Sequence, residues 1–474
     1  MKGVNRMKPL KASAPRSTAS IGAGLPLTAN EPQANTPLLP GVNVAVIGAG
    51  FVGLVSAAGF AEYGHSVVCI ENDEQKLERL MRGETPFFEP ELEELIQRNV
   101  QNGNLSFSND LAEAVKGQRA IFVAVGTPAS ATGRTDLGAL NAVAESLAPL
   151  LTAEQIFIIK STVPVGSAQN IREIFARVTN GSKPPAVVSN PEFLREGTAV
   201  HDFFHPDRVV IGGADSEAID TVIHIHKLGM IQAAPFVVTT NETAEMIKYA
   251  SNAYLATKIG FANELAGVCD SVKVDVMEVV RGMGMDTRIG HEFLNPGPGW
   301  GGSCLPKDIK EYIGMARQVE QRALIVEAVQ EANREQHQRI IDKTDKLLGG
   351  LSGRTVGVLG LAFKAGTSDM RNSPTIPIIA GLIKGGAAVR AFDPVVKENG
   401  SGLPAELEFV ADSAEVFDGA DCLLLLTEWQ DFQLLDWGRL GANMNARRIL
   451  DARNLLPPEL LRRHGYHYEG VGQI

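Results

Sequence analysis

The segment around Cys304 gathers residues that can do covalent chemistry. It reads Pro-Gly-Pro-Gly-Trp-Gly-Gly-Ser-Cys-Leu-Pro-Lys-Asp from Pro296 to Asp308. Its glycines allow the backbone to approach a ligand closely, and Pro306 suits the first turn of a helix. A helix that begins there would put the thiol at its positive end, which favours the thiolate, and would put Asp308 on the same face. Cys304 is therefore a candidate nucleophile, and a buried structural cysteine in a surface turn is the simpler alternative.

Two polar pairs are spaced to share a helical face. Glu192 and Glu196 lie four residues apart after Pro191, and Lys248 and Asn252 lie four apart in a longer helical pattern. By spacing alone, a solvated helix face is the better explanation for the two glutamates. By themselves, Lys248 and Asn252 do not indicate a function, because either can be an ordinary polar residue on an exposed helix face.

A glycine-rich turn near the start of the ordered pattern predicts a dinucleotide-binding unit. An apolar strand, Val44–Ile47, is followed by Gly48-Ala-Gly50-Phe-Val-Gly53, a helix-like run and a second strand that ends at Glu71. An acidic residue 18 positions past the last glycine completes this context. The carboxylate can accept hydrogen bonds from the ribose diol and repels a 2′-phosphate, so NAD is favoured over NADP. A glycine-rich turn in some other βαβ unit is the alternative.

Three more apolar strands are predicted at Ala120–Val125, Gln155–Lys160 and Ala186–Ser189. They lead into Val-Gly-Thr-Pro, Ser-Thr-Val-Pro-Val-Gly and Asn-Pro-Glu-Phe-Leu-Arg-Glu-Gly. Ligands of open parallel sheets bind beyond the carboxyl ends of the strands. These three loops are therefore expected to contribute contacts.

The pattern then changes to helices without strand partners. Thr239-x-x-Glu242 fits a capping box, and apolar residues recur at helical spacing to about Val268. We interpret this long helix as an inter-domain or dimer spine. Further helix-like sequence runs from Ile309 to about Leu348.

The C-terminal part returns to alternating strands and helices. Strands are predicted at Thr355–Leu361, Ala388–Phe392, Cys422–Leu426 and Arg448–Leu450. The whole pattern predicts an α/β fold with two doubly wound Rossmann-like domains joined by a central long-helix domain. We place a disordered tail at residues 1–40 and the three domains at 41–238, 239–348 and 349–474.

Composition excludes several classes of protein. The 474 residues carry 44 Lys and Arg against 55 Asp and Glu, a net charge of −11, so no global basic field attracts nucleic acid or an anionic membrane. No apolar run approaches the length of about 20 residues that a membrane span needs. Four widely spaced cysteines are too few for a disulfide framework. We expect a cytoplasmic protein.

Taken in order, the motifs resemble the UDP-glucose/GDP-mannose dehydrogenase family. The series is Gly-x-Gly-x-x-Gly, Val-Gly-Thr-Pro, Ser-Thr-Val-Pro-x-Gly, Asn-Pro-Glu-Phe-Leu-Arg-Glu-Gly, Lys-x-x-x-Asn, Gly-Gly-Ser-Cys-x-Pro-Lys-Asp and Gly-Leu-Ala-Phe-Lys. It covers about residues 41–474. The Gly-Trp-Gly-Gly run and the Arg-Ile-Gly block look more like the branch that acts on UDP-glucose. Glu71, where many relatives have Asp, and Leu305, where Phe is frequent, depart from the family pattern.

The resemblance implies two successive oxidations of a sugar C6 alcohol to a carboxylate, with NAD as the cofactor and one covalent cysteine. Cys304 would hold the aldehyde as a thiohemiacetal and then as a thioester. Lys248 and Asn252 would stabilise the oxyanion, with Lys248 also a candidate base. Asp308 and Thr162 would organise water and proton transfers, Glu196 would assist thioester hydrolysis, and Glu192 would lie beside the sugar.

Binding residues also follow from the resemblance, and no metal site is predicted. The cofactor contacts are Gly48, Gly50, Gly53, Glu71, Lys76, Thr127, Thr162, Glu196, Lys307 and Arg371. The contacts to a UDP-sugar substrate are Glu192, Phe193, Leu194, Lys248, Asn252, Arg288, Asn295, Gly299, Trp300, Gly301, Phe363, Lys364 and Arg453. In the family the residue at Arg288 reaches the sugar nucleotide of a neighbouring subunit, which implies a homodimer or a higher homo-oligomer.

Three alternatives stay open at this point. Another nucleotide-sugar 6-dehydrogenase would act on GDP-mannose or UDP-N-acetylmannosamine. A silent NAD-binding regulatory protein would not need the set of Cys304, Lys248, Asn252 and Asp308. A one-step 3-hydroxyacid dehydrogenase with a similar domain plan would need no cysteine.

Overall fold

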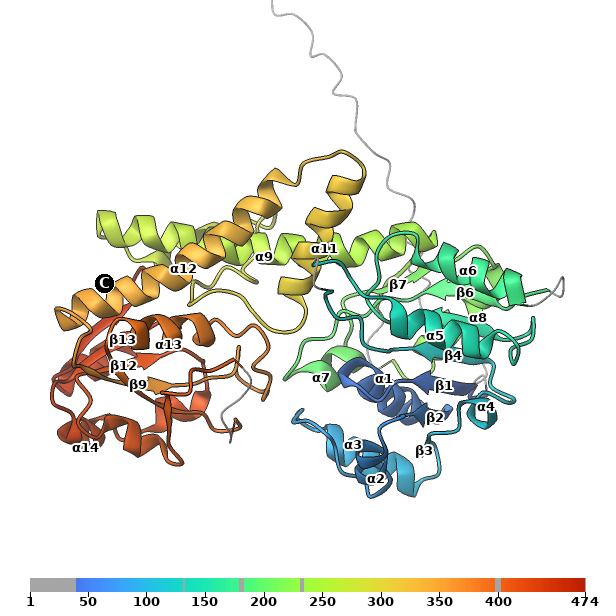
Figure 1. The fold of residues 1–474 in the computed structure, drawn as a ribbon, viewed down its shortest axis with the longest axis horizontal. Coiled ribbons are helices and arrows are strands. Elements are labelled where there is room, and N and C mark those ends of the chain that lie inside the picture. Colours follow the sequence, from blue (N-terminus) through green and yellow to red (C-terminus); the bar gives the residue numbers. More distant parts are fainter. Residues whose placement is uncertain (1–39, 131–132, 179–182, 231–233, 397–401, 474) are drawn as a thin grey trace, which may run out of the picture. The chain divides into compact units, whose positions relative to one another are not determined.

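The computed structural model describes residues 40–130, 133–178, 183–230, 234–396 and 402–473. Figure 1 shows two sheets with their helices and, between them in chain order, a group of long helices. The fold class predicted from the sequence is confirmed. The predicted tail, apart from Pro40, lies outside the described residues.

The first sheet has the strand order β3-β2-β1-β4-β5-β6-β7-β8. Its first six strands are parallel and follow the order of dinucleotide-binding sheets, whereas β7 runs antiparallel to β6. The strands are β1 Asn43–Ile47, β2 Ser66–Ile70, β3 Leu105–Ser108, β4 Ala120–Val123, β5 Ile156–Ile159, β6 Ala186–Ser189, β7 Val209–Gly212 and β8 Phe236–Thr239. The helices are α1 Phe51–Glu62, α2 Glu74–Met81, α3 Leu92–Gln101, α4 Leu111–Ala114, α5 Gly138–Leu147, α6 Ser167–Val178, α7 Ala199–Phe204 and α8 Ser216–Lys227.

Alternate residues of the inner strands face two different cores. Val44 and Val46 of β1 belong to one apolar cluster, and Ala45 and Ile47 belong to another. Because successive side chains of a strand point to opposite faces, both faces of the sheet are covered. This double burial explains why the inner strands appear in the sequence as uninterrupted apolar runs.

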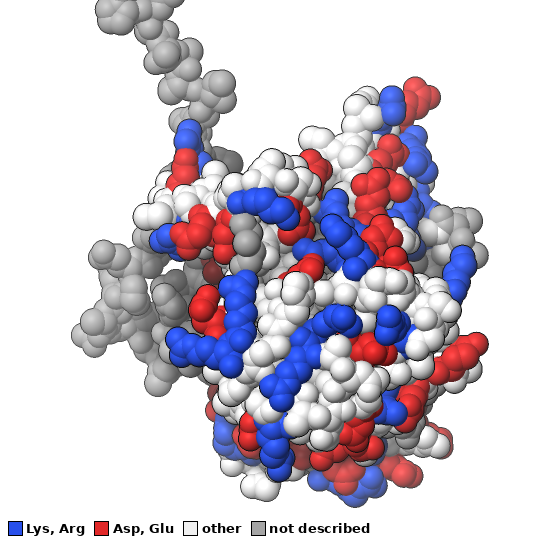
Figure 2. Space-filling view, turned by 90° about the vertical axis from the view of Figure 1, so that its left-hand side faces the viewer, with Lys and Arg blue, Asp and Glu red and all other residues white. Residues whose placement is uncertain are grey.

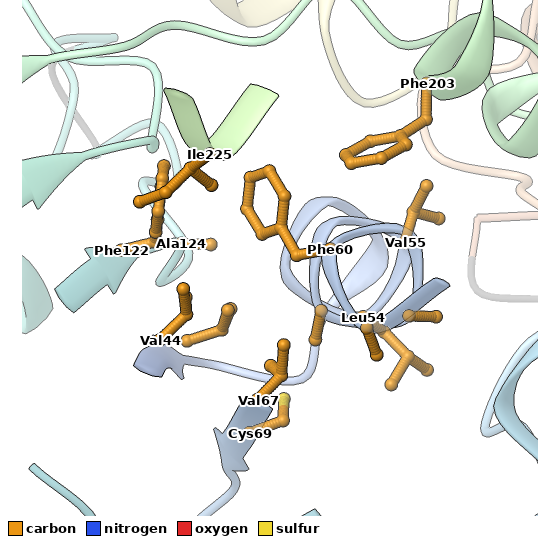
Figure 3. Packing of buried hydrophobic residues seen from close by; sticks show 14 of the residues in the cluster. Val44, Leu54, Val55, Phe60, Val67, Cys69, Phe122, Ala124, Phe203 and Ile225 are labelled. Carbon is orange, nitrogen blue, oxygen red and sulfur yellow. The ribbon is translucent and has the colours of Figure 1, made fainter. Parts of the chain in front are cut away.

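Phe60 of α1 is central to one of these cores (Figure 3). Its ring lies 4.7 Å from that of Phe122 and 5.3 Å from that of Phe203, centroid to centroid. Each buried phenylalanine contributes about 1.5–3 kcal/mol relative to an exposed one. Phe203 also packs so closely on Gly59 that a Cβ there would lie 2.2 Å from its ring. Since α7 carries Phe203, this contact anchors the chain directly after Glu196.

Edge strands account for most of the strands that the sequence pattern did not predict. β3 and β8 form the edges of the first sheet, and β11 and β14 form the edges of the second. Each is short and partly exposed, and β3, β11 and β14 mix polar with apolar residues, so these three lack a continuous apolar run. β8, in contrast, is apolar apart from its final threonine. β7 was not predicted either, although it is fully buried and its sequence is apolar apart from a final glycine.

The central region consists of α9 Asn241–Val272, α10 Val276–Gly284, α11 Leu305–Gln318 and α12 Leu324–Leu348. The capping residue predicted for α9 was wrong by one position. Thr239 is the last residue of β8, and the side chain of Thr240 accepts the hydrogen bond from the Thr243 amide. The helical sequence after Ile309 forms two helices, because the chain leaves α11 at Val319 and Glu320 takes a left-handed conformation.

The second sheet is parallel throughout and has the order β11-β10-β9-β12-β13-β14. Numbered from β9, this is the same order as that of the first six strands. The strands are β9 Thr355–Leu359, β10 Ala388–Phe392, β11 Glu408–Phe409, β12 Cys422–Leu425, β13 Arg448–Asp451 and β14 His467–Gly470. The helices are α13 Thr375–Lys384, α14 Trp437–Leu440 and α15 Pro458–Arg463, with the 3-10 turns η1 Ser413–Phe417, η2 Gln430–Leu434 and η3 Gly441–Asn443.

Acidic and basic side chains are interspersed on the face shown in Figure 2. No helix among the described residues is long and apolar enough to cross a membrane. No cluster of three or more metal-ligating side chains occurs among them either.

Candidate active site

Cys304 lies directly before α11, as its sequence predicts. Pro306 stands in the first turn, and the Asp308 amide donates to the Cys304 carbonyl at 3.0 Å. The residue is accessible to solvent, although protein atoms surround its sulfur closely.

The predicted low pKa of the Cys304 thiol was wrong. The surrounding protein atoms raise this pKa, because they displace water that would stabilise the thiolate, and the Glu192 carboxylate raises it further. The Lys248 ammonium lowers the pKa of the thiol, and the Asp308 carboxylate raises it. The position at a helix start therefore does not by itself produce a reactive thiolate.

Lys248 and Glu192 form a buried ion pair. The Lys248 Nζ atom lies 3.0 Å from Glu192 Oε1, and both side chains are 5% exposed. The Leu194 amide donates to the other carboxylate oxygen at 2.6 Å, and Lys248 also lies 5.2 Å from the centre of the Phe193 ring. Glu192, Cys304 and Asp308 together outweigh desolvation and raise the pKa of Lys248, so the ammonium is charged at neutral pH.

A second buried chain of contacts joins α9 to α11. The Asn252 side-chain amide donates to Asp308 Oδ2 at 2.6 Å, and Lys307 Nζ donates to Asp308 Oδ1 at 2.7 Å. Asn252 and Asp308 are both buried. Since Lys248 lies one turn before Asn252 on α9, these contacts place the cation, the amide and Asp308 close to Cys304.

Glu192 and Glu196 do not share a helical face, because residues 191–198 form a loop and a turn. Glu192 faces Lys248, whereas Glu196 accepts a hydrogen bond from Ser303 Oγ at 2.8 Å. Thr367 Oγ1 lies 3.4 Å from Glu196 Oε2, and Arg371 Nη2 lies 3.6 Å from Oε1. Burial, together with a nearby aspartate, raises the pKa of Glu196 to about 7.

Two residues at this site were not predicted from the sequence. Ser303 connects Glu196 with the thiol, and its position directly before Cys304 was the available signal. Glu245 is buried on α9, where its carboxylate accepts hydrogen bonds from the Gly166 amide at 2.7 Å and the Ala168 amide at 2.9 Å. Its position three residues before Lys248, on the same helix, was the signal there.

Glu245 holds the loop that contains Thr162. Thr162, Glu245 and Lys248 line one small cavity of about 10 Å³, roughly the space of a single water. The Thr127 hydroxyl donates to the Thr162 carbonyl at 2.9 Å. The strand-exit loops after β4 and β5 are thus joined to each other, and Glu245 joins the second of them to α9.

The start of α1 fits a dinucleotide. Gly50 is the N-cap and supplies no side-chain hydrogen bond, and a Cβ there would meet open space, so the first amides of α1 remain available to a phosphate. Gly53 lets the helix approach the preceding turn, because a Cβ would lie 1.8 Å from the Gly48 carbonyl oxygen. Glu71 directly follows β2, and Lys76 is an exposed residue of α2. These residues can hold NAD.

The glycine-rich loop is held by side-chain amides from α9 and α12. Asn263 Oδ1 accepts from the Gly297 amide at 2.7 Å. The side chain of Asn333 both accepts from the Trp300 amide and donates to its carbonyl. Gly299, Trp300 and Gly301 are consequently buried, whereas Asn295 is exposed.

The C-terminal domain contributes the loop after β9. The ring of Phe363 lies against Gly302, and Arg453 donates to the Phe363 carbonyl at 2.8 Å and to the Leu426 carbonyl at 2.8 Å. Burial lowers the pKa of Lys364, which lies beside Phe363 in this loop. Arg371 is bound mainly to Asp369.

The structure does not bring Arg288 to this site. Its side chain is 87% exposed and contacts Asp286 of its own loop. A single chain therefore leaves this predicted substrate contact in solvent.

Three models of one protein family match almost the whole described chain. The NAD binding domain of the UDP-glucose/GDP-mannose dehydrogenase family matches residues 42–229, its central domain matches 242–335, and its UDP binding domain matches 357–458.

The chain is also similar to individual proteins of this family. A UDP-glucose 6-dehydrogenase of Rhizobium meliloti (strain 1021) is 41% identical over 436 residues, which are 91% of this chain and 100% of that protein. The structure of a UDP-glucose dehydrogenase from Pyrobaculum islandicum is 35% identical with a TM-score of 0.85, covering 94% and 100% of the two chains. A UDP-D-ManNAc dehydrogenase from Pyrococcus horikoshii is 25% identical with a TM-score of 0.79, covering 91% and 99%. The chain belongs to the UDP-glucose/GDP-mannose dehydrogenase family.

Proposed function

We propose that this protein oxidises the C6 alcohol of UDP-glucose to the carboxylate of UDP-glucuronate, with NAD as the electron acceptor in both steps. One observation carries the proposal. Cys304 lies beside Lys248, Asn252 and Asp308 of the central helices and is connected through Ser303 to Glu196 of the NAD binding domain. Binding of a ligand alone does not require a thiol, a buried cation and a buried acid in one site.

Each side chain has a distinct task in this reaction. NAD, when bound, accepts the hydride from C6. The charged Lys248 and the amide of Asn252 stabilise negative charge on the C6 oxygen. The raised pKa of Lys248 supports this role over that of a base. Cys304 forms a covalent bond to the aldehyde carbon, so the aldehyde is retained between the two oxidations.

UDP-glucose is the better supported sugar nucleotide. The similarity to proteins named for UDP-glucose is 35% and 41% in identity, against 25% for the UDP-D-ManNAc dehydrogenase. The other candidate substrates are UDP-N-acetylmannosamine and GDP-mannose. They are tested in the same assay.

The test is the release of NADH with a panel of UDP- and GDP-sugars. We expect two NADH for each UDP-glucose consumed. We also expect Cys304→Ser to stall at or before the thioester while its circular dichroism stays that of the wild type. One NADH per sugar, or a Cys304→Ala variant with unchanged turnover, would contradict the covalent mechanism.

We further propose that the active form is a homodimer built on α9. Tyr254, Phe261 and Val268 recur every seven residues on this helix and are 62%, 49% and 54% exposed. Such a repeat is typical of a helix–helix seam. A partner would also give Arg288 a route to a neighbouring site. Phe261→Asp should halve the mass measured by light scattering, and an unchanged mass would refute the seam.

The compartment we propose is the cytoplasm. All four cysteines are free thiols, and three of them are buried. Free thiols persist where the medium is reducing. Labelling intact cells with a membrane-impermeant thiol reagent should leave Cys304 unmodified, and its modification would place the protein outside.

A further inference from the structure

Ser303 stands between the thiol and a carboxylate. Its hydroxyl donates to Glu196 Oε1 at 2.8 Å and lies 3.5 Å from Cys304 Sγ. A hydroxyl has one hydrogen and two lone pairs. When the Ser303 hydrogen points to Glu196, the contact with sulfur must therefore use the thiol hydrogen, and the chain of donors runs from Cys304 through Ser303 to Glu196.

In a second arrangement of the same three groups, the proton lies on Glu196 and not on Cys304. If Glu196 is protonated, it donates to Ser303, and Ser303 donates to a thiolate. Both arrangements satisfy every group, so a concerted shift of two hydrogens interconverts them. Ser303 contacts the reacting sulfur and is well placed for such a transfer.

The surrounding side chains favour Glu196 as the acceptor of the Cys304 thiol proton. The charged groups that face the sulfur are Lys248, Glu192, Asp308 and Arg371. Lys248 is already protonated, and Glu192 is occupied by Lys248 and the Leu194 amide. Asp308 is occupied by Asn252 and Lys307. Within the described residues, Ser303 Oγ is the hydrogen-bonding partner of the thiol.

Glu196 itself can change protonation state near neutrality. It faces Asp369, Arg371 and Thr367, and burial raises its pKa to about 7. A carboxyl group with this pKa can accept a proton and then release it to solvent within one catalytic cycle.

We propose that Ser303 is a catalytic residue that relays protons between Cys304 and Glu196. The proposal deepens the function proposed above and rests on it. When the sulfur bonds to the aldehyde carbon, the carbonyl π electrons move to the C6 oxygen beside Lys248 and Asn252. The thiol proton passes to Ser303, whose own proton passes to the Glu196 carboxylate and later leaves to solvent.

The relay runs in reverse when the thioester is hydrolysed. Water bonds to the thioester carbon, and its proton passes to the ionised Glu196. The carbon–sulfur bond then breaks with its electrons on sulfur. Sulfur takes the Ser303 proton and Ser303 takes the proton from Glu196, so Cys304 returns as a thiol and the sugar leaves as an acid.

The test is alkylation of Cys304 in the enzyme without substrate or cofactor. Wild type, Glu196→Gln, Ser303→Ala and the double variant are treated with iodoacetamide at pH 8. The Cys304 peptide is then followed by mass spectrometry, with the three buried cysteines as internal controls. The amide of Glu196→Gln can donate to Ser303, which leaves the Ser303 hydrogen free to stabilise the thiolate.

We expect Glu196→Gln to accelerate alkylation about tenfold when Ser303 is present, the effect of one hydrogen bond to a charged group. In the Ser303→Ala background Glu196→Gln should accelerate alkylation only about two- to threefold. The remaining effect is the loss of the screened repulsion between the Glu196 carboxylate and the Cys304 thiolate. Ser303→Thr keeps a hydroxyl and should behave as the wild type. Equal accelerations in both backgrounds would overturn the relay.

A second readout follows the reaction. Ser303→Ala should reduce NADH turnover and accumulate a covalent adduct on Cys304 in intact-protein mass spectra, and Ser303→Thr should reverse both effects. Full turnover in Ser303→Ala would also overturn the relay. If the wild type releases no NADH with any sugar nucleotide, the proposed function fails, and the alkylation result still decides the coupling of Ser303 to Glu196.

Discussion

Replacing Lys248 by methionine should expose the energetic cost of an unpaired buried charge. Methionine keeps much of the length of the side chain and removes its charge. Glu192 would then keep the Leu194 amide as a partner and lose an ammonium 3.0 Å away, at a position only 5% exposed. Breaking such a pair lowers the free energy of unfolding by about 3–5 kcal/mol.

This loss should appear as a lower thermal midpoint. For a folding unit of about 150–250 residues it corresponds to a decrease of roughly 6–20 °C. The double variant Lys248→Met/Glu192→Gln buries two neutral groups and should recover most of the decrease. Lys116→Met, which removes a cation from a surface pair with Glu113, should leave the midpoint unchanged.

The pH dependence provides a further check. The pKa of Lys248 is raised in the folded protein. The charged ammonium therefore adds its full contribution to the free energy of unfolding below the unfolded lysine pKa of about 10.4, and this contribution is lost as pH rises through the folded pKa. The difference in thermal midpoint between wild type and Lys248→Met, measured by differential scanning fluorimetry, should therefore be constant from pH 7 to 9. A change below about 2 °C, or no recovery in the double variant, would refute the buried pair.

Three further outcomes are expected. Glu245→Ala leaves the amides of the Thr162 loop without their acceptor and should cost about 2–4 kcal/mol in unfolding experiments, whereas Glu242→Ala, on the exposed side of α9, should cost little. The pH profile of kcat should rise with a midpoint of about 7 as Glu196 ionises, and this limb should be absent in Glu196→Gln. Glu71→Ser should raise kcat/KM for NADP relative to NAD by about tenfold, because a negative charge near the 2′-phosphate is removed; an unchanged ratio would mean that Glu71 does not contact the ribose.

Local interactions explain what was predictable from the sequence. The turn from β1 into α1 depends on glycines a few residues apart, and the start of α11 depends on Pro306. The inner strands are buried on both faces, so their apolar runs are unbroken. The edge strands β3, β11 and β14 are partly exposed and mix polar with apolar residues as loops do, so sequence patterns do not reveal them.

The site required the tertiary structure for a different reason. Spacing predicted one face for Glu192 and Glu196, yet a loop directs one to Lys248 and the other to Ser303. The pKa of the Cys304 thiol depends on charges that approach it from several segments of the chain, and they reverse the effect expected of a helix start.

The two doubly wound domains, the dinucleotide turn and the position of Cys304 before a helix could be predicted from the sequence, because each depends on residues near one another in the chain. The set of side chains that surrounds the thiol became visible only in the folded chain. Residues more than 100 positions apart, such as Glu196 and Ser303, meet there. Charge and hydrogen bonding act over a few ångströms of space, whatever the separation along the chain.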